Sequence, residues 1–255
     1  DDEDVIAGQG SIGLELLDQL PDLDAVIVPV GGGGLIGGVA FAIKSLNPNC
    51  KVYGVQASGA PSMYNSIAHH ERETLPSVST IADGIAVKQP GQLTYELCRK
   101  YVDEIVTVTD DEVSTAILAL IEQQKLIAEG AGAVAVAAAL FNKVDVKGKK
   151  VVCLVSGGNI DVTILSRVIT RGLLKAGRSA DITVELIIAE MGGNVVAVHH
   201  DRSGENTHID ACYLHLVMET RDHAHIAQIR KALTDHGYKI ISQSCSYVPD
   251  LEESS

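Results

Sequence analysis

The first 175 residues alternate between short apolar runs and longer segments whose apolar positions have helical spacing. The runs are rich in β-branched residues and lack polar alternation, which is typical of strands covered on both faces. The pattern predicts strands at Asp24–Val30, Lys51–Gln56, Glu104–Val108 and Lys150–Val155, and helices at Leu35–Leu46, Gly91–Tyr101, Gly130–Phe141 and Asp161–Lys175. A further helix is expected to begin at the capping box Thr109-x-x-Glu112. Strands that alternate with helices predict an α/β fold with a parallel sheet.

The pattern changes at Leu174–Ala180, where glycine and small polar residues follow a predicted helix. We interpret residues 1–175 as one domain, 176–180 as a linker and 181–255 as a second, smaller domain. The second domain is expected to be an α+β unit with an antiparallel sheet. Its predicted strands are Ile182–Leu186, Asn194–His200, His208–Met218 and Tyr238–Ser242, and its predicted helix is Asp222–His236.

The second domain is expected to be incomplete near its beginning. The strand that ends at Leu186 runs directly into Ile187–Glu190, which has the pattern of the last turn of a helix. No loop separates the strand from that turn. The acidic start Asp1–Asp4 is likewise expected to be an entry into the middle of a longer chain, and Ser244–Ser255 is assigned to no element.

Composition and charge exclude several classes of protein. Hydrophobic residues make up 46% of the 255 residues and charged residues 21%, as in ordinary globular chains. The net charge of −13 opposes binding to a phosphate backbone, so nucleic acid is not an expected partner. The longest apolar stretch, Ala133–Phe141, is too short to cross a bilayer, and no basic and apolar leader opens the chain. We therefore expect no membrane association and a cytoplasmic location.

Cysteine and histidine spacing predicts neither disulfides nor a metal site. The five cysteines lie far apart without a C-x-x-C spacing, so reduced thiols are expected. His199 and His200 are adjacent on a predicted strand and would point to opposite faces, and His223 and His225 would diverge on a helix. Surface exposure or ordinary polar packing is the expected role of these histidines.

Successive glycines at Gly31, Gly32, Gly33 and Gly34 connect a predicted buried strand to a helix that begins at Leu35. Without Cβ atoms, the backbone N–H groups of such a loop can converge on an anion, and the dipole of the helix favours negative charge there. A tight turn alone would need only one or two glycines. The loop therefore predicts a phosphate site.

The loop alone does not identify the phosphate compound, because Gly32–Gly37 also satisfies the dinucleotide pattern G-x-G-x-x-G. In that fold an acidic residue after the next strand holds the ribose. Here that strand ends in Gln56, which disfavours NAD.

A second turn, Ser156–Asn159, also lies between a strand and a helix, so its Ser156 hydroxyl is a candidate to contact the far end of a flat cofactor. Taken alone, this second turn is equally consistent with a purely structural role.

Several segments carry a resemblance to a known family. They are Ala7–Gly13 (AGQGSIG), Gly31–Leu35 (GGGGL), Ile81–Gly84 (IADG), Glu129–Gly132 (EGAG) and Ser156–Asp161 (SGGNID). In combination they make the chain similar to the catabolic-type threonine dehydratases, or threonine ammonia-lyases, which are fold-type II pyridoxal-phosphate enzymes. Residues 181–255 resemble an ACT domain, the small ligand-binding module of regulated members of that family.

The resemblance implies that pyridoxal 5'-phosphate is the cofactor, with its phosphate on Gly31–Leu35 and its pyridine nitrogen on the Ser156 hydroxyl. A neutral serine would not keep that nitrogen protonated, which favours β-elimination over transamination. The resemblance also implies that Asp83, Gly84 and Glu129 lie near the mouth of the site. From composition alone, the two carboxylates are more often solvated or structural.

The sequence also departs from the family. The Schiff-base lysine and the asparagine that faces the phenolic oxygen of the cofactor belong to an N-terminal segment that these 255 residues lack. We therefore assign no catalytic residue and expect the chain alone to be inactive. Related racemases bind a divalent metal through acids at the positions of Gln56 and Ser62, which are uncharged here, so no metal site is predicted.

The function implied is deamination of L-threonine to 2-oxobutanoate, and of L-serine to pyruvate, by a longer parent enzyme. The alternative is a non-catalytic nucleotide- or metabolite-binding module with a sensor domain. The expected partners are the amino-acid substrate, an allosteric amino-acid effector at the ACT-like domain, and further copies of the chain in a homodimer or tetramer.

Overall fold

The computed structural model describes residues 1–175, 187–201 and 213–240. The chain divides into two compact units, Asp1–Ala180 and Asp181–Ser255. Within the described ranges, no helix is both long and apolar enough to span a membrane.

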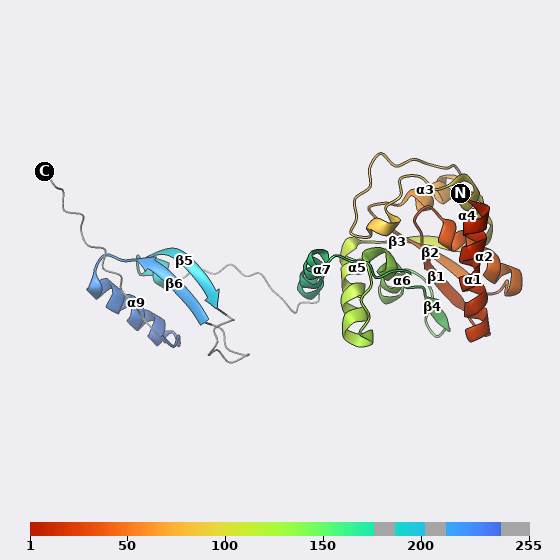
Figure 1. Ribbon diagram of the computed structural model, residues 1–255. Helices are drawn as coiled ribbons and strands as arrows, with labels where there is room; N and C mark the ends of the chain where they lie inside the picture. Colours follow the sequence, from red (N-terminus) through yellow and green to blue (C-terminus); the bar gives the residue numbers. More distant parts are fainter. Residues whose placement is uncertain (176–186, 202–212, 241–255) are drawn as a thin grey trace. The chain divides into compact units, whose positions relative to one another are not determined.

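The first unit is built on a four-stranded parallel sheet with the strand order β3-β2-β1-β4 (Figure 1). The strands are β1 (Ala25–Pro29), β2 (Lys51–Ala57), β3 (Glu104–Val108) and β4 (Val151–Cys153). Strand β1 is central, because Ala25 pairs with Lys51 on one side and with Val151 on the other. The α/β class and the parallel sheet predicted from the sequence are confirmed. Strand β4 is shorter than predicted, although the Leu154 N–H beyond its end still donates to the Ile27 carbonyl of β1 at 2.9 Å.

Helices cover both faces of this sheet (Figure 1). One face is covered by α2 (Gly34–Leu46), with α1 (Glu3–Gln19) and α4 (Gln92–Tyr101) beside it. The other is covered by α6 (Gly130–Leu140), which is backed by α5 (Asp110–Ala119) and α7 (Val162–Lys175). Every residue of β1 is buried, as expected for a strand that lies between two helical layers.

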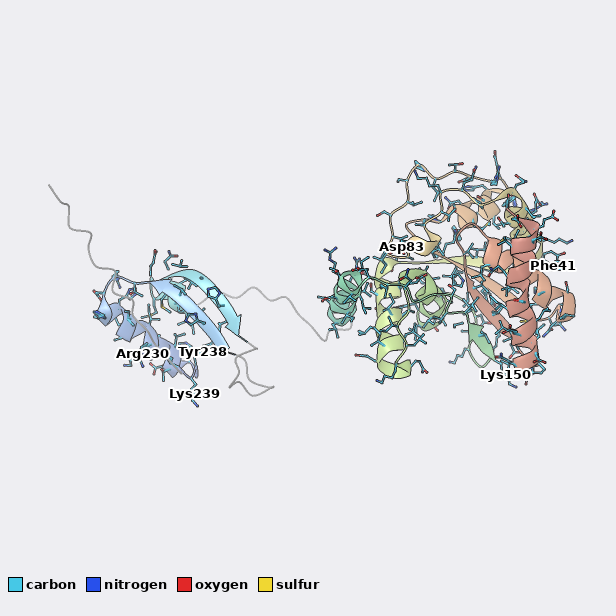
Figure 2. All side chains as sticks on the ribbon, in the orientation of Figure 1. Phe41, Asp83, Lys150, Arg230, Tyr238 and Lys239 are labelled. Atoms are coloured by element: carbon cyan, nitrogen blue, oxygen red, sulfur yellow. The ribbon has the colours of Figure 1, made fainter. Side chains whose placement is uncertain are left out.

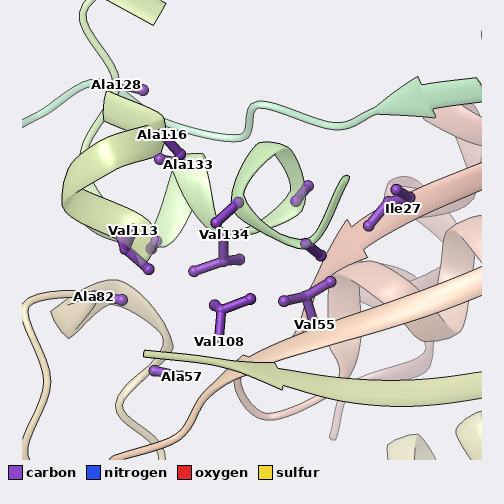
Figure 3. Packing of buried hydrophobic residues seen from close by; sticks show 14 of the residues in the cluster. Ile27, Val55, Ala57, Ala82, Val108, Val113, Ala116, Ala128, Ala133 and Val134 are labelled. Carbon is purple, nitrogen blue, oxygen red and sulfur yellow. The ribbon is translucent and has the colours of Figure 1, made fainter. Parts of the chain in front are cut away.

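Two hydrophobic cores lie on opposite faces of the sheet. Successive side chains of a strand point to opposite faces, so Val26 and Val28 belong to the core with α2, whereas Ile27 belongs to the core with α6. Figure 3 shows Val134 of α6 facing the sheet near Val55 in this second core. The missing polar alternation in the sequence therefore reflects burial from both sides.

The start of α5 confirms the predicted capping box. The backbone N–H of Glu112 donates to the Thr109 hydroxyl at 3.3 Å, and the Glu112 carboxylate accepts the backbone N–H of Thr109 at 2.8 Å. These bonds satisfy two of the N–H groups that a helix start leaves without partners.

The sequence pattern did not predict helix α1, because its glycines lower helix propensity and interrupt the helical spacing of its apolar residues. The segment Ala7–Gly13 belongs to this helix and packs against α2. A Cβ atom at Gly38 of α2 would lie 2.1 Å from the Ile6 carbonyl oxygen, so the two backbones approach closely. The segment Ala7–Gly13, which is part of the family resemblance, therefore packs two helices against each other. Two shorter helices, α3 (Ser62–His69) and η1 (Asp83–Ile85), were also not predicted.

The second unit contains an antiparallel pair, β5 (Asn194–Asp201) and β6 (Tyr213–Glu219), with the helices α8 (Ile187–Glu190) and α9 (His223–Asp235). The predicted strand Ile182–Leu186 and residues 176–186 as a whole lie outside the described residues. Residues 238–240 form no strand, so that prediction is wrong at its start, and its last two residues are not described. Gly237 has a φ of 88°, and the Tyr238 N–H donates to the Leu233 carbonyl, which turns the chain at the helix end.

Candidate active site

The glycine loop after β1 and the turn after β4 open onto one hollow of about 230 Å³. The hollow is lined by Pro29, Gly31, Gly32, Gly33, Gly34, Leu35, Gly84, Ile85, Glu129, Ala131 and Ser156. The two loops meet because β1 and β4 are parallel neighbours, so their carboxyl ends lie at the same edge. The chain leaves β1 toward β2 on the other side, and such a switch point is where α/β sheets bind ligands.

Of the residues singled out from the sequence, the structure brings together Gly31–Leu35, Gly84, Glu129 and Ser156. Asp83 does not line the hollow. Its carboxylate accepts the backbone N–H of Gly84 at 2.9 Å, and its side chain is exposed at the surface of η1 (Figure 2). Pro29, Ile85 and Ala131 were missed, although each adjoins or belongs to a segment that the sequence had marked.

The N-terminus of α2 lines the hollow with Gly33, Gly34 and Leu35. Gly33 is the N-cap residue, and no side chain caps this helix. The N–H groups of Gly34, Leu35 and Ile36 belong to the first turn and have no acceptor within the helix. No Lys or Arg is among the residues found to line the hollow. An anion there would be held by backbone N–H groups and the helix dipole, which is the donor set that suits a phosphate group.

Gly33 is required by its conformation and by its surroundings. Its φ is 97°, in the left-handed region, and a Cβ atom would lie 2.6 Å from the Met63 Cε and 2.9 Å from the Thr94 Cβ. Gly32 differs, because a Cβ atom there would have no neighbour within 4 Å. The space beside Gly32 is therefore open to a ligand, so the loop fits the phosphate of a cofactor.

Glu129 connects the start of α6 to the second glycine turn. Its backbone N–H donates to the Gly157 carbonyl at 3.1 Å, and its carboxylate accepts the backbone N–H of Asn159 at 3.1 Å. The side chain is half-buried, while Ser156 is exposed. The carboxylate thus has a structural contact that fixes the turn carrying Ser156.

Gln56 lies in the interior and not at the hollow. It is fully buried in β2, and its side-chain oxygen accepts the backbone N–H of Tyr64 at 2.8 Å. Its Nε2 and the hydroxyl of Ser62 are buried without a hydrogen-bond partner in the described part of the chain. No cluster of three or more His, Cys, Asp or Glu suited to a metal ion occurs among the described residues.

In the second unit, His199 contacts a histidine of the neighbouring strand. The strand register places His199 opposite His215, and their rings stack with centroids 6.1 Å apart. His225 is buried, accepts the backbone N–H of Arg221 through Nδ1 at 3.1 Å and donates through Nε2 to the Met191 carbonyl at 2.8 Å.

Cys50, Cys98 and Cys153 are free thiols. Burial raises the pKa of Cys98 to about 12, so this thiol stays protonated and unreactive at neutral pH. Cys212 and Cys245 lie outside the described residues.

A glycine-lined helix start at the switch point of a parallel sheet is an arrangement that suits a phosphate group in an α/β domain. Residues 1–157 match the sequence model of the family described as "Pyridoxal-phosphate dependent enzyme". The chain belongs to this family, whose cofactor is pyridoxal phosphate, and the family resemblance found in the sequence is confirmed.

Relatives from several organisms are similar over 66% to 94% of the chain. It is 51% identical over 251 residues to an L-threonine ammonia-lyase from Thermotoga maritima, which covers 94% of this chain and 62% of that protein. It is 49% identical over 170 residues to a catabolic L-threonine dehydratase of Escherichia coli, covering 66% of this chain and 52% of that protein. The structure of processed threonine deaminase isoform 2 from Solanum lycopersicum has a TM-score of 0.65 and 42% identity, covering 68% of this chain and 48% of that one. The chain thus spans 62% or less of the length of these relatives.

Proposed function

We propose that this chain acts as part of a threonine ammonia-lyase, which converts L-threonine to 2-oxobutanoate and L-serine to pyruvate with release of ammonia. The observation that carries this proposal is the glycine-lined hollow at the start of α2 in a member of the pyridoxal-phosphate family. The relatives named as threonine ammonia-lyase and threonine dehydratase support the substrate class. Residues 1–175 would then be the C-terminal part of the catalytic domain.

In this proposal Gly31–Leu35 hold the phosphate of pyridoxal 5'-phosphate through backbone N–H groups. The cofactor supplies an electron sink that stabilises negative charge at the substrate Cα, so that the β-hydroxyl can leave. Ser156 lines the same hollow, and its hydroxyl would donate a hydrogen bond to the pyridine nitrogen. Because a hydroxyl is neutral, it orients the ring without holding that nitrogen in its protonated form, which favours elimination over transamination.

Gly84 and Glu129 line the hollow, and Glu129 and Asp83 bond to the backbone of the turns that surround it. Gly84 follows Asp83 on the η1 turn and lines the hollow beside Ile85. Glu129 holds the turn of Ser156 through its contact with Asn159. Asp83 contributes through its bond to the Gly84 N–H and not through contact with a ligand.

The test is turnover by the whole protein that carries this chain. With pyridoxal 5'-phosphate present, L-threonine should give equal amounts of 2-oxobutanoate and ammonia, and Gly32→Val should lose most of this activity because its side chain fills the open space in the hollow. Gly8→Val is the matched control, since Gly8 also faces open space but lies on α1. No keto acid from threonine or serine would contradict the proposal, as would full activity of Gly32→Val. The alternative of a non-catalytic binding module has no support among the relatives described above.

We propose further that residues 181–255 form an ACT-like regulatory domain that binds an amino acid and pairs with a second copy in a homodimer or tetramer. The antiparallel pair β5–β6 with α9 supports this interpretation. An effector would shift turnover through a coupling of about 1–3 kcal/mol. We also propose a role in isoleucine biosynthesis, and the cytoplasmic location expected from the sequence stays a prediction.

Deletion from Arg178 onward in the whole protein tests the regulatory proposal. The truncated protein should keep threonine turnover but lose its response to isoleucine, valine or serine. A whole protein that responds to no amino acid would contradict regulation, and a monomeric mass by light scattering would contradict the oligomer. Neither result would affect the proposed lyase activity.

A further inference from the structure

The carbonyl oxygen of Gly32 receives hydrogen bonds from the start of α4, a helix that follows the loop by about sixty residues in the chain. The Thr94 hydroxyl donates to it at 2.6 Å, and the Gly91 N–H donates at 3.4 Å. Thr94 is only 2% exposed. The shorter of the two bonds is therefore made by a buried side chain that comes from outside the loop.

This bond has a consequence for the neighbouring N–H group. In a trans peptide the C=O and the N–H point in opposite directions, so the orientation of the Gly32 carbonyl also fixes that of the Gly33 N–H. The carbonyl points to α4, and the Gly33 N–H must therefore point away from α4. Since both glycines line the hollow, the Thr94 hydroxyl sets the direction of one of its donors.

Thr94 also packs against the loop. Its Cβ lies 2.9 Å from the position that a Cβ atom of residue 33 would take, next to the Cε of Met63. Thr94 is not among the residues that line the hollow, so it contacts the loop from behind. Its methyl side and its hydroxyl can be tested separately, because valine keeps the shape and serine keeps the hydroxyl.

We infer that Thr94 is a positioning residue for the cofactor phosphate, which aims the Gly33 N–H at the anion without touching it. This inference rests on the proposed function, because it needs a phosphate in the hollow. Without the hydroxyl, the Gly32 carbonyl keeps only the longer bond from Gly91. The Gly32–Gly33 peptide can then rotate, and the N–H loses its fixed direction.

The experiment compares Thr94→Val with Thr94→Ser in the whole protein, by titration with pyridoxal 5'-phosphate and with pyridoxal, which lacks the phosphate. Thr94→Val should bind the phosphorylated cofactor about tenfold more weakly, as expected for the loss of a buried hydrogen bond, with pyridoxal affinity unchanged. Thr94→Ser should bind both compounds like the wild type. Thr94→Ala serves as a second variant without the hydroxyl, in case valine crowds the carbonyl and prevents folding.

Equal weakening of both compounds by Thr94→Val and Thr94→Ala would overturn the inference, because it would show a general loss of structure. Wild-type affinity in both variants would also overturn it. The same titration with Gly32→Val separates the two proposals. If Gly32→Val weakens cofactor binding while the Thr94 variants do not, only the inference about Thr94 fails. If Gly32→Val has no effect either, the phosphate loop itself is wrongly assigned.

Discussion

The carboxylate of Glu129 accepts the backbone N–H of Asn159 at 3.1 Å and so joins the beginning of α6 to the turn that carries Ser156. The two residues are thirty positions apart in the chain. The contact makes the position of the turn that carries Ser156 depend on Glu129, which lines the same hollow.

Glu129→Ala should therefore loosen the Ser156 turn. We expect faster hydrogen exchange at the Asn159 amide and a loss of about 1 kcal/mol in the free energy of unfolding, because one partly exposed hydrogen bond is removed. Glu129→Gln keeps an acceptor oxygen and should change both values less. Glu15→Ala, an exposed substitution on α1, is the control. Unchanged exchange at Asn159 in Glu129→Ala would show that the contact does not hold the turn.

Ser156→Ala should leave the fold intact, because Ser156 is exposed and the change removes one hydroxyl. Turnover of threonine by the whole protein should fall more than cofactor occupancy, since the pyridine nitrogen loses its partner while the phosphate keeps its donors. The measurement is kcat together with the absorbance of bound cofactor. Wild-type turnover by Ser156→Ala would show that the Ser156 hydroxyl has no role in the reaction.

Gly33→Ala and Gly32→Ala should differ in stability although they are neighbours. At Gly33 the new methyl group meets Met63 and Thr94 and requires a left-handed backbone, so we expect a loss of about 3 kcal/mol. At Gly32 the methyl group faces open space, and the stability should change by less than about 1 kcal/mol. Urea unfolding of both variants measures the difference. Equal losses would mean that the loop has another conformation.

Asp103 connects α2, β2 and the start of β3. Its carboxylate bonds to Lys44 at 2.7 Å, to Lys51 at 2.8 Å and to the backbone N–H of Val52 at 2.8 Å. Burial raises the pKa of Asp103, but the bonds from Lys44, Lys51 and Val52 together outweigh burial and hold that pKa below its usual range.

A lowered pKa means that the folded state binds the proton of Asp103 less tightly than the unfolded state does. The stabilisation is therefore complete above the unfolded pKa of about 3.9, and it is lost as the pH falls through the lower folded pKa. Asp103→Asn should cost about 1 kcal/mol at neutral pH, because solvent screens part of the ion pairs. Its stability should also decline less on acidification, which urea unfolding across the acidic range would measure. Parallel pH profiles of wild type and variant would contradict this.

His225 should be important for the stability of the second unit. It is 2% exposed and bridges the backbones of Arg221 and Met191. His225→Ala should lower the stability of this unit by about 2 kcal/mol, because two buried backbone groups lose their partner. The exposed His223, on the same helix, provides the matched control as His223→Ala. Hydrogen exchange in α9 measures this change. Equal exchange rates in His225→Ala and His223→Ala would show that the bridge made by His225 does not stabilise the unit.

The features that the sequence predicts are local ones. Strand β1 and the helix after it were predicted because burial on both faces leaves an unbroken apolar run, and successive glycines mark a helix start that no side chain caps. The contact of Thr94 with Gly32 could not be predicted, since it joins segments that are distant in the chain and depends on how α4 packs beside α2. The pairing of His199 with His215 depends on strand register, which the spacing of histidines does not encode. The place of Asp83 near the site mouth, which the family resemblance implies, stays a prediction; its bond to the Gly84 N–H depends on the local η1 turn, which the sequence pattern did not predict.

The most direct test of the phosphate site is a crystal structure of the whole protein with pyridoxal 5'-phosphate bound. The phosphate oxygens should lie within hydrogen-bond distance of the backbone N–H groups of Gly31–Leu35, with the pyridine nitrogen facing the Ser156 hydroxyl. A phosphate group bound anywhere other than the N-terminus of α2 would contradict the assignment of the cofactor phosphate to Gly31–Leu35.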